Sequence, residues 1–231
     1  MIPAPDLAGP AYAGIRTRVT DLLAAAGPDV ATTTVPACPD WTVKDVVAHL
    51  AGACEDILAG NLDGVATDAW TGAQVERHRD ATLAEVVDLW GVVGPSVEAI
   101  TGAFPASAAA QWVFDATTHE QDLRGALRRP GARDADNVAI AAAFLASSLD
   151  GLVRAQGLPT LALRLDSDPA LVLGEGEAAA TLRATRFAFV RAFGGRWSLD
   201  QVRGLAWDGD PEPYFAMFGA VLKPPSSPAD E

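Results

Sequence analysis

The sequence predicts an α+β protein in which an N-terminal antiparallel helical bundle is followed by a small α+β domain. Apolar residues recur at helical spacing up to about residue 157, and beyond Pro159 they alternate in period two, as in strands. With 231 residues, 49% of them hydrophobic, the chain can bury the core of one large or two small domains. We expect a bundle at residues 1–157, a smaller α+β domain at 158–222 and a flexible tail at 223–231.

The first two helices are predicted from apolar stripes with clear ends. One spans residues 7–26 and is stopped by a Gly-Pro pair. After a stretch broken by prolines, Thr42 is placed to cap a second helix, with Asp45 at the third position of a capping box. The buried stripe of this helix comprises Val43, Val46, Val47, Leu50, Cys54, Ile57 and Leu58. His49 lies beside the stripe, so its ring should point toward the interior of the bundle.

Three further helices complete the predicted helical part. Thr82 and Glu85 form a second capping-box pattern, and the apolar stripe after them extends to Ile100. A fourth helix is expected from about residue 106 to 127. The fifth, at residues 137–156, is apolar on most faces before Gly-Leu-Pro ends it. Helices joined by short connections in this way favour an antiparallel four-helix bundle with one additional helix.

In the C-terminal part, alternating segments separated by Asp-Pro and Gly-rich turns predict strands within residues 160–167, 170–174 and 180–185. Thr185 is then placed to begin a short helix that a Gly-Gly pair closes. Residues 198–210 predict a further helical turn and a strand. This mixture of short strands and helices is typical of a small α+β domain.

Charge and composition exclude several classes of partner. The net charge of -13 at pH 7 opposes nucleic acid and anionic membranes, and no apolar run approaches the roughly 18 residues of a membrane span. The N-terminus lacks a basic start and an apolar signal segment, so we expect a cytoplasmic protein. In that compartment Cys38 and Cys54 should be buried free thiols, a core role being favoured over soft metal ligands.

The most informative pattern is a histidine on the predicted second helix and an acid-histidine pair on the fourth. Asp115 and His119 project from one helix face, and His49 from a neighbouring helix would add a third metal ligand. Three protein ligands leave a coordination position open for chemistry. Taken alone, an Asp and a His four residues apart on a helix are more often a surface pair or a capped polar contact. However, Trp112 and Asp122 continue the same stripe beside apolar positions, where buried polar groups need partners.

Other ionisable side chains have two interpretations each. Asp122 and Asp45 either fix the tautomer of an imidazole or are solvated helix charges. Glu120 points roughly a hundred degrees away from His119 around the helix and is expected to meet solvent or an arginine. His78 lies among charged residues and is expected to be exposed.

Two helical motifs and a C-terminal segment resemble a known family. WTVKDVVAHL at residues 41–50, followed by acid-x-x-x-His-x-x-Asp-Leu-Arg at 115–124, resembles the mycothiol-dependent maleylpyruvate isomerase family of the DinB/YfiT-like superfamily. The segment RFAFVRAFGGRWSLDQVRGLAWDGD looks like the family's C-terminal part, so the resemblance covers most of the chain. It implies a DinB-like bundle that binds a divalent metal, usually zinc, through His49, Asp115 and His119. The family's acid is usually glutamate, and Asp115 is the shorter side chain.

The resemblance also implies a chemistry. The small sugar-bearing thiol mycothiol would take the open metal position, become a thiolate and add to a small electrophile such as maleylpyruvate. Reversible addition permits cis-to-trans isomerisation. Arg191 or Arg196 is expected to contact the thiol or the substrate carboxylates as the catalytic arginine, the alternative being an ion pair with the chain's own carboxylates. We therefore expect an isomerase or thiol S-transferase that uses zinc and mycothiol.

Two other functions remain compatible with the sequence. The same fold also suits a non-catalytic metal-binding or regulatory module, and the change from glutamate to Asp115 gives that alternative weight. Metal-assisted hydrolysis with Asp122 or Glu120 as base is chemically possible, but nothing in the spacing selects it. We expect the protein to be a monomer or a homodimer.

Overall fold

The computed structural model describes residues 2–166, 168–217 and 225. It divides into an N-terminal unit, Ala4–Gly131, and a C-terminal unit that begins at Ala132. The predicted tail at 223–231 lies outside the described residues, Pro225 apart. The predicted α+β class is confirmed, with helices throughout the described chain and a small sheet in the C-terminal unit.

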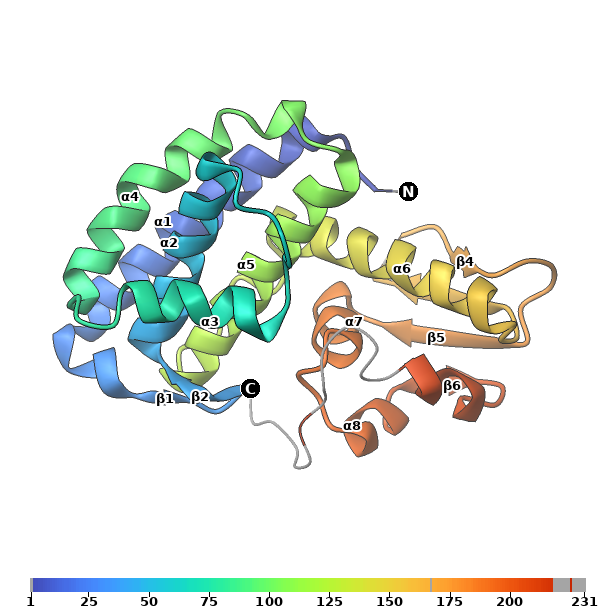
Figure 1. The fold of residues 1–231 in the computed structure, drawn as a ribbon. Coiled ribbons are helices and arrows are strands. Elements are labelled where there is room, and N and C mark those ends of the chain that lie inside the picture. Colours follow the sequence, from blue (N-terminus) through green and yellow to red (C-terminus); the bar gives the residue numbers. More distant parts are fainter. Residues whose placement is uncertain (1, 167, 218–224, 226–231) are drawn as a thin grey trace. The chain divides into compact units, whose positions relative to one another are not determined.

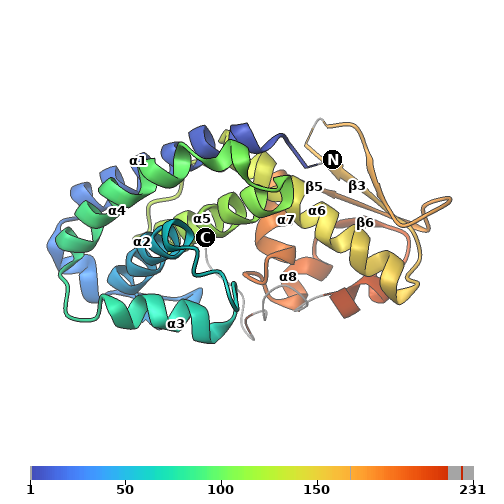
Figure 2. The same cartoon turned by 45° about the horizontal axis from the view of Figure 1, so that its top comes forward.

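Four helices form the bundle of the N-terminal unit (Figure 1). They are α1 (Ala8–Ala26), α2 (Val43–Ala59), α4 (Leu83–Glu98) and α5 (Ala106–Ala126). Going around the bundle, α1 packs against α4, α4 against α2, α2 against α5, and α5 against α1 (Figure 2). The four helices therefore enclose one core. The predicted capping boxes are both present, Thr42 with Asp45 on α2 and Thr82 with Glu85 on α4. These caps fix where α2 and α4 begin.

The bundle core is centred on Tyr12 of α1. Its ring stacks on Trp112 of α5 with 3.6 Å between ring centroids. Trp90 of α4 donates a hydrogen bond of 3.0 Å from Nε1 to the Tyr12 hydroxyl, which also lies 3.3 Å from the Cys54 sulfur of α2. Tyr12 therefore connects all four helices, through its ring to α5 and through its hydroxyl to α2 and α4. The hydroxyl is satisfied, as buried polar groups usually are.

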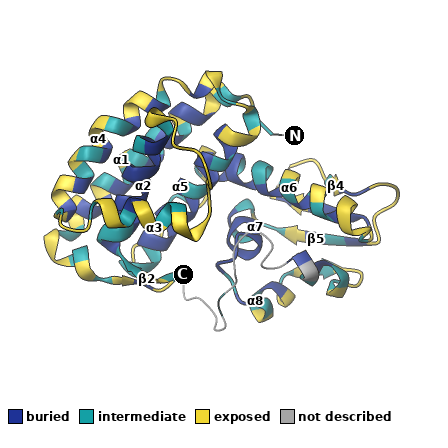
Figure 3. Ribbon diagram, viewed as in Figure 1, coloured by how far each residue is buried: buried dark blue, intermediate teal, exposed yellow. Residues whose placement is uncertain are grey.

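Two elements of this unit were not predicted. The hairpin of β1 (Thr34–Val35) and β2 (Cys38–Thr42) pairs antiparallel within the proline-containing stretch. Helix α3 (Asp68–Arg77) was missed because its sequence has no apolar stripe. Gln74 is its only buried residue (Figure 3). Short 3-10 turns occur at Pro5–Leu7, Pro28–Thr32, Thr101–Ala103 and Glu212–Met217.

The sheet of the C-terminal unit has the strand order β4 (Leu171–Leu173), β3 (Leu161–Leu165), β5 (Ala180–Ala184), β6 (Ala206–Asp208). β3 and β5 are parallel, with Leu163 opposite Leu182, and the two outer pairs are antiparallel. Helices α7 (Arg186–Phe193) and α8 (Leu199–Arg203) follow, and α7 begins after its predicted cap Thr185. The predicted strands and helices of this part are therefore all present.

Helix α6 (Asp136–Gln156) groups with the sheet rather than with the bundle. The structure thus places the unit boundary at residues 131–132, whereas we expected it at residue 157. α6 packs against α7 and β4, and an apolar pattern on most faces does not say which neighbours will cover it. Among the described residues it is also the one helix long and apolar enough to cross a membrane, with 44% of that stretch buried.

Candidate metal centre

The structure brings the three predicted ligand residues together. His49 projects from α2, and Asp115 and His119 project from α5, which packs beside α2. His49 Nε2 lies 3.2 Å from Asp115 Oδ2, and His119 Nε2 lies 3.6 Å from Asp115 Oδ1. The imidazoles are buried, with side-chain exposures of 2% and 7%, whereas the Asp115 side chain is 37% exposed.

These separations fit a shared divalent cation. In a tetrahedral zinc site with bonds of about 2.0 to 2.2 Å, neighbouring ligand atoms lie about 3.3 to 3.6 Å apart. The separations of 3.2 and 3.6 Å between imidazole and carboxylate match this spacing. All three ligand atoms lie within 4.8 Å of one another. Two imidazole nitrogens and a carboxylate oxygen are donors that zinc accepts.

The outer nitrogens of both rings face acceptors. His49 Nδ1 lies 2.7 Å from Gln74 Oε1, and His119 Nδ1 lies 3.1 Å from Asp122 Oδ2. The His119 contact is close, but its direction is not that of a hydrogen bond, so a small ring rotation is needed to align it. Protons on Nδ1 leave the Nε2 lone pairs pointing toward Asp115. In that tautomer both Nε2 atoms could share a cation with Asp115, which is how metal-binding histidines are usually arranged.

Two tryptophans flank the imidazoles. The Trp41 ring, at the end of β2, lies 5.8 Å from the His119 ring in a stacked arrangement and 5.2 Å from the His49 ring. Trp70 of α3 meets His49 edge-on at 6.5 Å. Apolar rings against metal-binding imidazoles limit water access and strengthen electrostatic interactions at the centre. This flanking position was not predicted from the sequence.

The other ionisable residues that we considered have different surroundings in the structure. Asp122 has a fully buried side chain beside His119, as expected of a group that fixes a tautomer rather than of a solvated charge. Asp45 instead caps α2. The expectation that His78 is exposed was wrong: its side chain is 13% exposed and its Nε2 lies 2.8 Å from Glu55 Oε2.

Glu120 contacts arginines, which was one of the two predicted alternatives, but it does so in the interior of the protein. Its carboxylate is fully buried and receives paired hydrogen bonds of 2.8 and 2.7 Å from Arg18 of α1. Arg124 adds contacts of 3.2 and 3.0 Å one turn further along α5. This carboxylate therefore links α1 to α5 and is not available as a base.

Both cysteines are free thiols in different surroundings. Cys38 is half-buried, which differs from our expectation, and its Sγ lies 3.5 Å from Asp122 Oδ2. Cys38, Asp122 and the other nitrogen of His119 form a second group of ligand atoms within 4.8 Å, adjoining the first group. Cys54 is buried, and burial raises the pKa of its thiol to about 12.

The two thiols should differ strongly in alkylation by iodoacetamide. A pKa of about 12 lowers the thiolate fraction of Cys54 at neutral pH on the order of 10³-fold relative to an ordinary cysteine. Peptide mass spectrometry of the folded protein should therefore show modification of Cys38 first. Cys54 should react only after denaturation, and equal rates in the folded protein would contradict its inert position.

Arg191 and Arg196 belong to the C-terminal unit. Arg191 lies on α7 and is 1% exposed, and Arg196 follows that helix and is 7% exposed. Buried guanidinium groups keep partners, and both residues have them. Their assignment as catalytic arginines stays a prediction.

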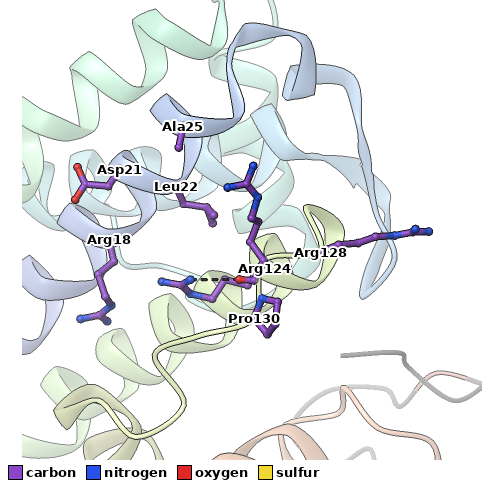
Figure 4. A pocket seen from close by; sticks show the side chains of 8 residues that line it. Arg18, Asp21, Leu22, Ala25, Arg124, Arg128 and Pro130 are labelled. Atoms are coloured by element: carbon purple, nitrogen blue, oxygen red, sulfur yellow. Dashed lines mark hydrogen bonds between the residues drawn. The ribbon is translucent and has the colours of Figure 1, made fainter.

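A surface hollow of ≈ 530 Å³ lies away from the three ligands, which do not line it. Arginines dominate its wall, namely Arg18, Arg124, Arg128 and Arg129, with Asp21 and Leu22 beside them. The Arg124 side chain lies among these residues (Figure 4) and donates to the main-chain carbonyl of Arg129. Arg18 and Arg124 are already committed to Glu120, so the hollow is mainly a by-product of that buried pairing.

Comparisons with known proteins identify a family and a fold. Residues 12–134 match the family model described as the mycothiol maleylpyruvate isomerase N-terminal domain. A crystal structure of a histidine-to-alanine variant of the mycothiol-dependent maleylpyruvate isomerase has a TM-score of 0.59 at 15% identity, covering 88% of this chain and 91% of that chain. A second crystal structure of the mycothiol-dependent maleylpyruvate isomerase gives 0.52 at 14% identity with the same coverage. These likenesses show the fold. No curated protein matches the chain.

Proposed function

The chain belongs to the mycothiol maleylpyruvate isomerase N-terminal domain family, and on that premise we propose that it is a zinc-dependent, mycothiol-using isomerase or thiol S-transferase. The observation that carries the proposal is the convergence of His49, Asp115 and His119 from two packed helices. A family match alone leaves the chemistry open, because one fold hosts many functions. Two imidazole nitrogens and one carboxylate oxygen, spaced as zinc ligands are, favour metal-assisted chemistry among the functions that this fold can host.

Each ligand has a distinct part in the proposed site. His49 and His119 would hold the ion through Nε2, and Asp115 through a carboxylate oxygen. A bound divalent cation lowers the pKa of a coordinated thiol, so that the thiolate is available at neutral pH. Asp122 lies 3.1 Å from His119 Nδ1, and a ring aligned with it would carry its proton on Nδ1 and offer Nε2 to the ion.

The substrate is proposed to be a small electrophile that carries carboxylates, such as maleylpyruvate. Arg191 and Arg196 are the proposed carboxylate-binding residues, because a guanidinium group binds a carboxylate in a bidentate manner. Trp41 and Trp70 limit water around the imidazoles, which protects a reactive thiolate from unproductive protonation.

A non-catalytic metal-binding module is the second candidate. It is favoured by Asp115, which stands where the resembled family usually has glutamate and whose shorter side chain has less reach. The two functions differ in one respect: only the enzyme needs an outside thiol at the metal.

Metal content and thermal stability test the proposal. Tag-free protein purified without added metal or chelator should contain about one equivalent of zinc by plasma mass spectrometry. Added zinc should raise the Tm of metal-free protein, and mycothiol should raise it further only when zinc is present. At a hundredfold excess over Kd each ligand contributes about 2.7 kcal/mol, a shift of several degrees for a chain of this size.

The outcomes separate the candidates. Zinc binding with no effect of mycothiol would favour the non-catalytic module. No metal after reconstitution would overturn both metal-dependent functions, and a mycothiol shift without metal would place the thiol at another site.

A further inference from the structure

Helix α3 buries a polar residue where a helix normally buries apolar ones. Its only buried residue is Gln74, which has no exposed surface at all. The helix packs against α2, and Figure 3 shows most of its length exposed. Burying an amide without hydrogen bonds is costly, so its partners must explain its position.

Gln74 and its partners form a chain of hydrogen bonds between Asp56 and His49. Gln74 Nε2 donates to Asp56 Oδ2 at 2.7 Å, and Gln74 Oε1 lies 2.7 Å from His49 Nδ1. Arg77 and Asn61 donate to the other oxygen of Asp56, at 2.7 and 3.1 Å. Burial raises the pKa of Asp56, but the bonds from Gln74, Asn61 and Arg77 outweigh burial and lower it, so Asp56 is an ionised acceptor at neutral pH.

This chain fixes the orientation of the amide. An ionised carboxylate only accepts hydrogen bonds, so the Gln74 nitrogen must face Asp56 and its oxygen must face His49. An amide oxygen also only accepts, so His49 must carry a proton on Nδ1. The lone pair of the neutral ring is then on Nε2, the atom that faces Asp115.

A glycine on α2 makes room for this arrangement. A Cβ at Gly52 would lie 2.7 Å from Gln74 Cβ and 2.9 Å from its Cγ, closer than side chains tolerate. Glycine within a helix costs about 1 kcal/mol relative to alanine, so its presence needs a packing reason. The close approach of α3 at Gly52 supplies that reason.

We propose that Gln74 is a positioning residue that holds His49 in the Nδ1-protonated tautomer, and that α3 serves chiefly to deliver it. The inference rests on the proposed metal function. It adds that α3, through Gln74, determines which nitrogen of His49 is available to the metal. Partners of this outer kind typically change metal affinity by roughly 10- to 100-fold when removed.

The tautomer can be read directly in metal-free protein. The chain has three histidines, so long-range proton-nitrogen NMR spectra of the side chains are simple to assign. Wild-type His49 should show a protonated Nδ1 and an unprotonated Nε2. In Gln74→Leu this preference should be lost. Gln74→Glu should retain it where the new carboxyl group is protonated, because it then donates to Asp56 and still accepts from Nδ1. A wild-type His49 protonated only on Nε2 would overturn the inference, even if Gln74→Leu failed to fold.

Zinc affinity gives a second readout, measured by competition with a chelating dye. Gln74→Leu should raise the Kd for zinc roughly 10- to 100-fold, and Gln74→Glu should raise it less. Gly52→Ala should also weaken binding, because it displaces Gln74 without removing a polar atom. The matched control is Glu76→Gln, an exposed change on the same helix, which should leave the Kd within about twofold.

The two readouts separate failure of the inference from failure of the proposed function. If wild-type protein binds no zinc, the metal function is overturned, and the tautomer spectra of wild type and Gln74→Leu still decide the role of Gln74. If wild type binds zinc but folded Gln74→Leu keeps both tautomer and Kd, the role of Gln74 is overturned and the metal function stands.

Discussion

His119→Ala is expected to lose its bound zinc and to lower mycothiol-dependent turnover of maleylpyruvate by about 10³-fold or more. The substitution removes one of three ligands, and several kcal/mol of thiolate stabilisation would be lost with the ion. His49→Ala should have the same effect. Zinc content by plasma mass spectrometry and turnover should be measured on the same preparations, with circular dichroism to show that the helices remain.

The third histidine provides the matched control. His78 contacts Glu55 at the end of α3 and is not part of the ligand cluster, so His78→Ala should keep zinc and turnover within about twofold. Normal turnover by a metal-free His119→Ala variant would refute the proposed mechanism.

Glu120→Ala is expected to destabilise the protein by about 2 to 4 kcal/mol. Removing one partner of a buried ion pair costs about 3 to 5 kcal/mol, because the remaining charge is left uncompensated. Arg18 and Arg124 have side-chain exposures of 31% and 13%, so water recovers part of this cost. Urea unfolding of metal-free protein, followed by circular dichroism, measures the change in the free energy of unfolding.

An exposed glutamate calibrates the measurement. Glu76 has a side chain 63% exposed and pairs with Arg79 on the surface, so Glu76→Gln should change stability by less than about 1 kcal/mol. Equal unfolding midpoints for Glu120→Ala and wild type would contradict the role of Glu120 in joining α1 to α5.

Most of the bundle could be predicted from local sequence signals. Residues such as Thr42 and Thr82 cap helices through side chains three positions away, and apolar stripes repeat every three or four residues. That Asp115 and His119 project from one face of a helix was also predictable, because they lie four residues apart. These features depend on neighbours in the sequence.

The features that were missed depend on tertiary contacts. Helix α3 buries only Gln74 and has no apolar stripe, and its Thr67 cap alone does not distinguish a helix from a turn. Glu120 is a helix charge whose burial becomes possible only because Arg18 approaches from α1. In the same way, the pattern of α6 predicts a buried helix but not the unit in which it is buried.

The uneven exposure of the three ligands bears on how an ion would enter and leave. His49 and His119 are enclosed, and Asp115, with 37% of its side chain exposed, faces solvent. Exchange with dissolved metal would then pass by this carboxylate and would not require the bundle to open. A site that equilibrates while folded takes the ion that its surroundings supply, so the metal bound in the cell would follow the competition among available divalent ions.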